Sequence, residues 1–248
     1  VVLVFICAVI FLGGVQRLAS VCEKLVPVMA ALFLMGGVVI LIARAKYLPE
    51  TFGMIFSYAF KPQAIIGGAF GMAIKEAVSQ GAKRGLFSNE AGMGSTPHAH
   101  AQANVEKPHD QGVVAMIGVF IDTFVVLTMT ALVVISTLYA GDGILSSGAA
   151  EGVSKANMAQ LAFGSVFGTK GGNIFVAVCL FFFAFSTIIS WNLFGKVNAI
   201  YLFGKKSEKI YAVIAVIFTF LGSCLSNDLV WELTDMFNQL MVIPNALA

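Results

Sequence analysis

Three long apolar runs constrain this chain most strongly. They cover residues 25–44, 112–139 and 173–203. A helix that spans a bilayer needs roughly 20 consecutive apolar residues. Within the bilayer, only helices and closed barrels satisfy every backbone polar group. Because the runs have the length of spanning helices, the sequence predicts an all-α polytopic membrane protein.

Composition supports this class and excludes others. Charged residues make up 11% of the chain, against roughly 25% in a soluble protein. The net charge is +2, without the basic stripe that nucleic-acid binding requires. We therefore expect a lipid bilayer around the protein and no nucleic-acid partner. The four cysteines show no metal-ligand spacing and are interpreted as small buried hydrophobic residues.

Shorter segments complete the expected order along the chain. Residues 1–14 are too short to span and are interpreted as the end of a truncated helix. The remaining predictions are an interfacial turn over 16–24, with Pro27 in the first turn of the next span; an interfacial loop or surface helix over 47–62; a connector over 140–172 containing a short helix around 155–167; a span over 210–225; a tight turn at 227–228; and a last amphipathic span over 229–248.

Residues 85–100 interrupt this pattern and read GLFSNEAGMGSTPHAH. Backbone that leaves a helix inside a membrane survives only within protein or along a polar cavity. A Gly- and Pro-interrupted segment is also the best sequence indicator of a transporter's binding site. We interpret it as a broken helix that unwinds near 88–92, with a second half-helix starting near Gly94. The alternative is a polar hairpin between two ordinary spans.

Such a break offers two kinds of ligand. The N–H groups of the second half-helix favour an anionic group such as a carboxylate, and carbonyls freed from the first half can coordinate a small cation. Glu90 either pairs with a nearby cation or holds the two halves together. The candidate substrate-binding residues are Ser88, Asn89, Gly92, Gly94, Ser95, Thr96 and, as a cap on the cavity, Trp191. For Trp191, simple packing is the alternative.

Asp122 is the one charge in the span 112–139. An ionisable residue near the bilayer midplane is a functional-site hypothesis. We expect Asp122 either to bind a coupling ion or orient the broken helix, or else to make a structural hydrogen bond to a helix missing from this fragment.

Ser186, Thr187 and Ser190 lie on consecutive turns of the most aromatic span, so we expect their three hydroxyls to share a face. Hydroxyl and carbonyl oxygens are hard ligands that suit Na⁺, as they suit Ca²⁺ and Mg²⁺. These residues, with Asp122, are the Na⁺ candidates. The alternative is interhelical packing, for which Ser and Thr are common in membranes.

Catalytic and metal centres are not indicated. His98 and His100 are two residues apart and have no evident third ligand. Ser95 with His98 lacks a nucleophile elbow and has Pro97 between them. We therefore expect neither an enzyme nor a cofactor.

The run from Lys83 to His100 strongly resembles the signature of the alanine or glycine:cation symporters, which carry small neutral amino acids with sodium. The segments 122–128 (DTFVVLT) and 183–191 (FAFSTIISW) also resemble that family. The resemblance implies a fold of two five-helix inverted repeats, in which the first helix of each repeat is broken at the site. It also implies that Ser186 and Thr187 lie on the eighth core helix, where related carriers bind sodium.

On that mapping, residues 1–248 form a single transmembrane domain fragment, from the end of core helix 4 through most of core helix 10. The missing N-terminal helices of the same chain would then be a partner. The implied function is uptake of alanine or glycine by alternating access in the plasma membrane, as in a bacterial inner membrane, with Na⁺ as coupling ion. A cation channel or pore-lining protein is the alternative.

Overall fold

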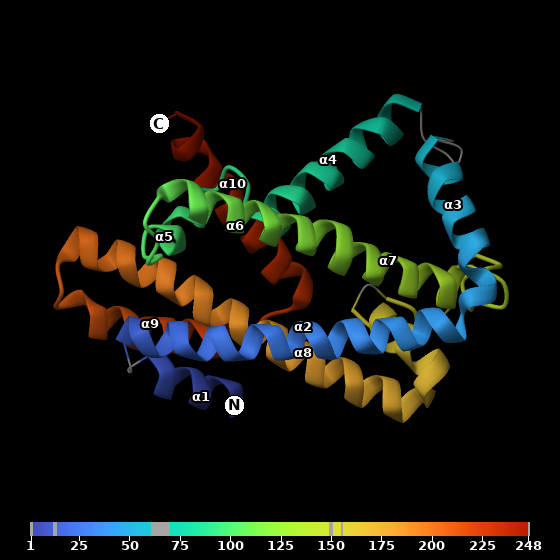
Figure 1. The fold of residues 1–248 in the computed structure, drawn as a ribbon, viewed down its shortest axis with the longest axis horizontal. Helices are drawn as coiled ribbons and strands as arrows, with labels where there is room; N and C mark the ends of the chain where they lie inside the picture. The colour runs from blue at the N-terminus through green and yellow to red at the C-terminus, as the bar shows by residue number, and fades with distance from the viewer. Residues whose placement is uncertain (1, 12–13, 61–69, 149–150, 155, 248) are drawn as a thin grey trace. The chain divides into compact units, whose positions relative to one another are not determined.

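The computed structural model describes residues 2–11, 14–60, 70–148, 151–154 and 156–247, and Figure 1 shows their helices in chain order. The described residues form helices and no strands, which confirms the predicted all-α class. The elements are α1 (Val2–Phe11), α2 (Gly14–Ala43), a 3₁₀ turn (Ala45–Tyr47), α3 (Leu48–Phe60), α4 (Phe70–Asn89), α5 (Pro97–His100), α6 (Pro108–Phe120), a π-helical stretch (Ile121–Leu127), α7 (Thr128–Val134), a second π-helical stretch (Ile135–Tyr139), α8 (Met158–Phe203), α9 (Ser207–Gly222) and α10 (Asn227–Leu247).

Three described helices are long and apolar enough to cross a membrane. They are Ser20–Ala43, Pro108–Tyr139 and Met158–Phe203. Each coincides with one of the three long apolar runs to within one residue or contains it, so the prediction of a multi-pass membrane protein is confirmed at the level of helix length and composition.

Two local predictions are wrong. Residues 16–24 lie inside α2 and do not form a turn, so Pro27 falls within the helix and not in its first turn. The segment 16–24 is rich in Leu, Ala, Gln, Arg, Glu and Lys, all strong helix formers. Residues 227–228 begin α10, and the reversal lies just before them. There the Leu229 N–H donates to the Ser226 hydroxyl at 3.4 Å, in the manner of a helix cap.

The other shorter segments agree with the structure. The surface-helix alternative for 47–62 corresponds to α3, and the span predicted over 210–225 corresponds to α9. Gly168 has φ 74° and ψ 156°, which kinks α8 and separates its first turns from the long remainder. Those first turns are the short helix predicted around 155–167.

The chain divides into two compact units, which we describe separately. The first unit comprises Val1–Pro27, Gly81–Ala115 and Phe182–Ala248, and the second comprises Val28–Gln80 and Met116–Phe181. Each unit is assembled from segments far apart in sequence. Whether residues 1–248 act as one domain stays a prediction.

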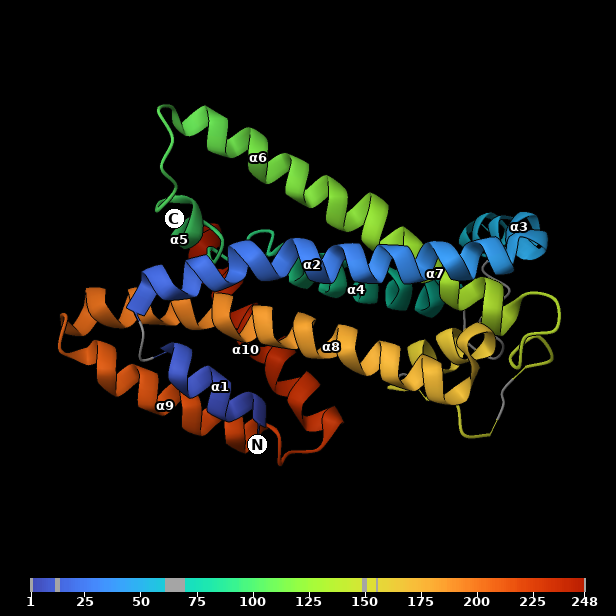
Figure 2. The same ribbon diagram turned by 60° about the horizontal axis from the view of Figure 1, so that its bottom comes forward.

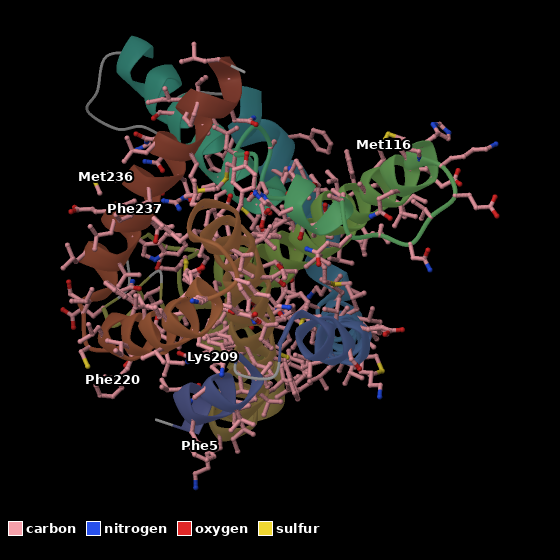
Figure 3. All side chains as sticks on the ribbon, turned by 90° about the vertical axis from the view of Figure 1, so that its left-hand side faces the viewer. Phe5, Met116, Lys209, Phe220, Met236 and Phe237 are labelled. Atoms are coloured by element: carbon pink, nitrogen blue, oxygen red, sulfur yellow. The ribbon has the colours of Figure 1, made fainter. Side chains whose placement is uncertain are left out.

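The core of the first unit joins α1, α8 and α9. Figure 2 shows α1 lying alongside α9. Their buried side chains meet the apolar face of α8, and the cluster consists of Cys7, Ile10, Phe11, Phe185, Ile189 and Ala212. Several apolar side chains of this unit, including Phe5, Phe220 and Met236, stand off the outside of the ribbon in Figure 3. Exposed apolar residues of this kind suit a surface that meets lipid.

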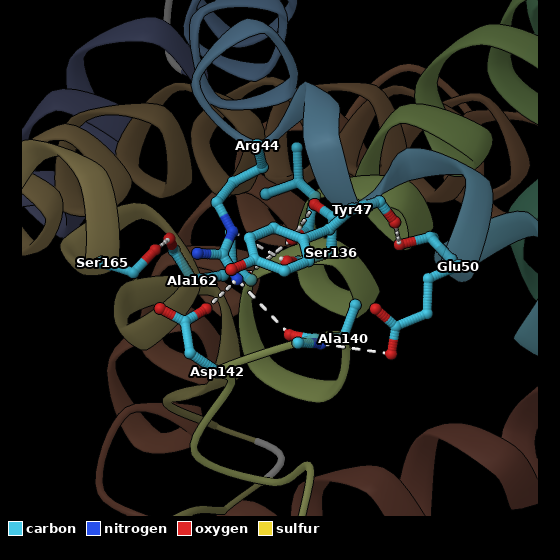
Figure 4. Close-up of polar contacts among 12 residues, drawn as sticks. Arg44, Tyr47, Glu50, Ser136, Ala140, Asp142, Ala162 and Ser165 are labelled. Carbon is cyan, nitrogen blue, oxygen red and sulfur yellow. Dashed lines mark hydrogen bonds and ion pairs between the residues drawn. The ribbon is translucent and has the colours of Figure 1, made fainter.

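The core of the second unit packs α2 against α7 and the first part of α8. Its buried residues are Ile40, Val133, Leu138, Ala162, Phe163 and Val176. Beside it, Arg44 holds the end of the π-helical stretch Ile135–Tyr139, as Figure 4 shows. Arg44 Nε donates to the Ser136 carbonyl at 2.9 Å, one terminal nitrogen lies 2.7 Å from Asp142, and the guanidinium lies 4.1 Å from the Tyr47 ring centroid.

Candidate functional site

The predicted interruption of the helix is present in the first unit, and its interpretation as one broken spanning helix instead of a polar hairpin stays a prediction. Helix α4 ends at Asn89, the chain leaves the helix over residues 90–96, and α5 begins at Pro97. Glu90, Gly92 and Gly94 have φ values of 50°, 74° and 73°. This left-handed conformation costs glycine little. The second half starts three residues later than predicted and is four residues long, because Gly94 is still left-handed whereas Pro97 suits a first helical position.

Glu90 closes the break from within. The hydroxyls of Ser95 and Thr96 both donate to the same Glu90 carboxylate oxygen, at 2.7 and 2.8 Å. Ser95 is buried. Of the two roles considered for Glu90, the geometry supports holding the two halves together. The two hydroxyls therefore point toward Glu90.

Helix α10 makes a further hydrogen bond to the break. The Asn245 side-chain amide donates to the Gly92 carbonyl at 2.9 Å. A Cβ on Gly94 would lie 2.9 Å from the Asn245 Oδ1 atom. One carbonyl freed by the break therefore already accepts a hydrogen bond from α10.

His98 links α5 to α8. Its Nδ1 donates to the Ser95 carbonyl at 2.9 Å, and its Nε2 lies 3.3 Å from Asn198 Oδ1. The ring centroid lies 6.1 Å from that of Phe194. Within the described part of the chain, no three His, Cys, Asp or Glu residues are grouped so that they could hold a metal ion.

A hollow of about 410 Å³ lies beside the break. It is lined by residues of α4, α8 and α10, among them Phe87, Thr187, Trp191, Thr234, Phe237 and Asn238. Aromatic side chains with a few hydroxyl and amide groups are typical of a small-molecule site. Two predicted site residues, Thr187 and Trp191, line this hollow. The predicted residues from Ser88 to Thr96 are not among the described residues that line it.

Arg84 on α4 faces α10 next to the hollow. Its two terminal nitrogens lie 3.4 and 3.3 Å from the two carboxylate oxygens of Asp235. The guanidinium also lies 4.6 Å from the Trp231 ring centroid, and Phe87 makes an edge contact with the same indole.

Comparison with known proteins identifies the family. The model of the sodium:alanine symporter family matches residues 1–248. The chain belongs to this family. It is 37% identical over 247 residues to a sodium/alanine symporter, AgcS, of Methanococcus maripaludis, covering 99% of this chain and 52% of that protein. It is 33% identical over 260 residues to a sodium/proton-dependent alanine carrier protein of Bacillus sp. PS3, covering 99% of this chain and 57% of the relative.

A further relative is an uncharacterized transporter of Haemophilus influenzae, 36% identical over 248 residues, covering 100% of this chain and 53% of the relative. The chain thus spans about half the length of these curated relatives. The resemblance found in the sequence is confirmed, and the family is one of transporters.

The sodium candidates of this symporter-family chain fall in different places. The Ser186 and Ser190 hydroxyls donate along their own helix, to the carbonyls of Phe183 and Ser186, both at 3.0 Å. Ser186 is buried, whereas Thr187 is exposed toward the hollow. Ser186 and Ser190 therefore share one face and Thr187 lies on another. Their binding of Na⁺ stays a prediction.

Asp122 lies in the second unit, within the π-helical stretch Ile121–Leu127, and is half-buried. Single π-helical turns are frequent at functional sites. Its proposed role toward an ion also stays a prediction.

Two buried polar residues of α8 escaped the sequence interpretation. Lys196 is 1% exposed, and its Nζ lies 2.9 Å from Glu208 and 3.5 Å from the Phe11 carbonyl. Lys196 holds the pKa of the Glu208 carboxyl below its usual range, chiefly through this hydrogen bond. Asn192 is buried, and within the described residues neither polar atom of its side chain has a hydrogen-bond partner.

A sequence signal for Lys196 was available. An ionisable residue inside an apolar run is a default candidate for a functional or structural role, and that rule, applied to Asp122, applies equally to Lys196. Arg84 and Asp235 were visible as charges on their segments, but their pairing depends on the packing of α4 against α10.

Proposed function

We propose that the protein is a secondary symporter of the plasma membrane, such as a bacterial inner membrane, which couples Na⁺ entry to the uptake of alanine or glycine. It works by alternating access. Membership of the sodium:alanine symporter family supports cation-coupled transport of an amino acid. The names of two relatives, a sodium/alanine symporter and a sodium/proton-dependent alanine carrier, support alanine as cargo.

The observation that carries this proposal is the break between α4 and α5 next to the hollow. A hydrophobic segment interrupted at membrane depth is where secondary transporters bind substrate and ion. Here the break is closed by neutral and acidic side chains, with Glu90 accepting from Ser95 and Thr96. The aromatic wall beside it offers Phe87 and Trp191 to a small side chain.

The cargo ion is assigned to the hydroxyls of α8. Na⁺ prefers oxygen ligands, and the Ser186, Thr187 and Ser190 hydroxyls each carry an oxygen atom that can act as one. Thr187 lies at the wall of the hollow. An ion there would act on the same helix as Trp191, so ion and substrate would favour the same conformation of α8.

The test is uptake of radiolabelled alanine into proteoliposomes that hold the protein at full length, with and without an inward Na⁺ gradient. Wild type is compared with Thr187→Ala and with Thr219→Ala as matched control, since Thr219 lies on α9 and donates to its own helix at 2.7 Å. We expect wild type and Thr219→Ala to accumulate alanine against its gradient. Thr187→Ala is expected to lose at least about tenfold in apparent Na⁺ affinity.

Three results would change the proposal. If Thr187→Ala accumulates alanine as wild type does, Thr187 is not a ligand of the ion. Asp122 is then tested next, by Asp122→Asn. Flux that does not saturate with substrate indicates a channel. Absence of accumulation of both alanine and glycine in wild type contradicts the proposed function.

A further inference from the structure

The ion pair between Arg84 and Asp235 has no role in the transport cycle outlined above. It joins α4 to α10 through two residues that are 151 positions apart in sequence. Both helices also carry residues that line the hollow. The pair is therefore the strongest candidate for a further site in the first unit.

The pair lies beside the hollow. Phe87, one helical turn after Arg84, lines the hollow, and so does Thr234, which directly precedes Asp235. Trp231 of α10 contacts both Arg84 and Phe87 of α4. Its ring lies 4.6 Å from the Arg84 guanidinium and 6.0 Å from the Phe87 ring. A cation, an anion and the wall of one cavity are thus brought together by two helices.

The geometry of the pair is loose. Charge-assisted N–H···O bonds usually measure about 2.7–2.9 Å, whereas these contacts measure 3.4 and 3.3 Å. The Arg84 side chain is 46% exposed and that of Asp235 is 22% exposed. Pairs of this kind contribute little to stability, so a competing ligand can separate them at small cost. The indole of Trp231 keeps the guanidinium in place when its anion is exchanged.

We propose that Arg84 and Asp235 form a binding site for a zwitterionic α-amino acid at the edge of the hollow. Arg84 binds the carboxylate and Asp235 binds the ammonium group. The side chain of the amino acid is directed toward Phe87 and Phe237, and Thr234 and Asn238 supply polar groups along the same wall. This site deepens the proposed function and rests on it, because it takes an amino acid as cargo.

The charge pattern selects for a molecule with both charges. A zwitterion replaces one loose ion pair with two charge-assisted contacts, so neither protein charge is left without a counter-charge. A carboxylate alone leaves Asp235 unpaired, and an amine alone leaves Arg84 unpaired. An unpaired charge in a partly desolvated site is unfavourable, so singly charged analogues bind more weakly.

The experiment measures initial rates of Na⁺-driven alanine uptake against alanine concentration, for the full-length protein in proteoliposomes. We expect Arg84→Gln and Asp235→Asn each to raise the KM for alanine about tenfold while the maximal rate stays within about twofold. Lys83→Gln is the matched control, because it removes a positive charge from the adjacent residue of α4, and we expect its KM to equal that of wild type. Arg84→Lys keeps the charge without the planar fork and gives an intermediate KM.

Competition with alaninamide tests whether Arg84 binds the ligand or only holds α4 against α10. Alaninamide has the ammonium group but no carboxylate. In wild type we expect alanine to compete for uptake at a lower concentration than alaninamide does. Arg84→Gln is expected to reduce the ratio of the alaninamide concentration to the alanine concentration that gives half-inhibition, because Arg84 no longer binds the carboxylate. If Arg84 only stabilised the packing of α4 against α10, its loss would leave this ratio unchanged.

The charge-swapped double variant, Arg84→Asp with Asp235→Arg, gives the second readout. The swap restores an ion pair between α4 and α10, so a purely structural role is recovered. It does not restore a ligand site, because the two charges are reversed relative to the hollow. A wild-type KM in the swapped protein, or in both single variants, overturns the proposed site while wild-type accumulation leaves the transport function intact. If wild type accumulates neither amino acid, both proposals fail together.

Discussion

Each of the two units contains a helix end that is held by side-chain contacts, and the contacts differ between the two ends. In the first unit the chain turns through left-handed residues after Asn89, and the local carboxylate of Glu90 gathers Ser95 and Thr96. In the second unit the helix ends at Tyr139, and Arg44, a cation that directly follows α2, binds the carbonyls of Ser136 and Ala140.

The difference follows from which backbone groups are exposed. The last carbonyls of a helix carry partial negative charge, so a cation such as Arg44 satisfies them well. At the break, the closing contacts come from neutral hydroxyls and from the Asn245 amide. The contacts of Arg44 with the helix end are strong and specific to one geometry. The break is held by hydrogen bonds from two hydroxyls to the Glu90 carboxylate and from the Asn245 amide to the Gly92 carbonyl, and these can exchange for ligand contacts, as a binding site requires.

Removing the Arg44 anchor is expected to have the largest effect. Arg44→Met keeps most of the apolar stem but leaves the Ser136 and Ala140 carbonyls without this donor, which should lower the free energy of unfolding by about 3 kcal/mol. The measurement is denaturant unfolding of the protein in detergent micelles. Lys46→Met, at an exposed neighbour, serves as control and should change stability little. Equal effects of the two variants would mean that Arg44 acts only as a surface charge.

A side chain at Gly94 should have the next largest effect. Gly94→Ala imposes left-handed strain at φ 73° and brings Cβ within 2.9 Å of Asn245, for a loss of about 2 kcal/mol. Gly85→Ala is the control, because Gly85 lies inside α4 with no atom within 4 Å of the added carbon. That change should stabilise by up to about 1 kcal/mol. A stabilising Gly94→Ala would show that the break does not require its left-handed turn.

Acid should produce the smallest effect, and in the second unit it acts through Asp142. Arg44 holds the pKa of Asp142 below its ordinary value of 3.8, chiefly through their hydrogen bond. A lowered pKa means that the stabilisation is complete above that ordinary value and is lost as pH falls through the lowered one. We expect the unfolding midpoint of wild type to fall faster than that of Asp142→Asn as pH decreases below about 4. Parallel curves for the two proteins would contradict this assignment.

The sequence was informative where one physical constraint acts alone. The length of the apolar runs predicted the spanning helices, and the glycines between Asn89 and Pro97 predicted the break. The prediction of a turn over 16–24 was wrong. The charged residues there were interpreted as lying at the membrane interface, but they are good helix formers and α2 continues through them.

Pairings between distant segments could not be predicted in the same way. Nothing in the pattern of α4 or α10 indicates that Arg84 meets Asp235, or that Asn245 reaches the carbonyl of Gly92. Such contacts depend on how helices pack, and many packings satisfy the same apolar pattern. The same reason explains why Thr187 could be placed on α8 from sequence, but not at the wall of a hollow.

The buried Lys196 bears on how the protein enters the membrane. A lysine at the centre of an inserting helix costs roughly 2.5–3.5 kcal/mol on insertion scales, less toward the helix ends. In the folded chain its ammonium lies 2.9 Å from Glu208, in the first turn of α9. That charge is neutralised only once the residues after the loop at Gly204 are in place. For biogenesis, α8 and α9 therefore form one hairpin, and a nascent chain that stopped after α8 would hold a cation without its counter-charge.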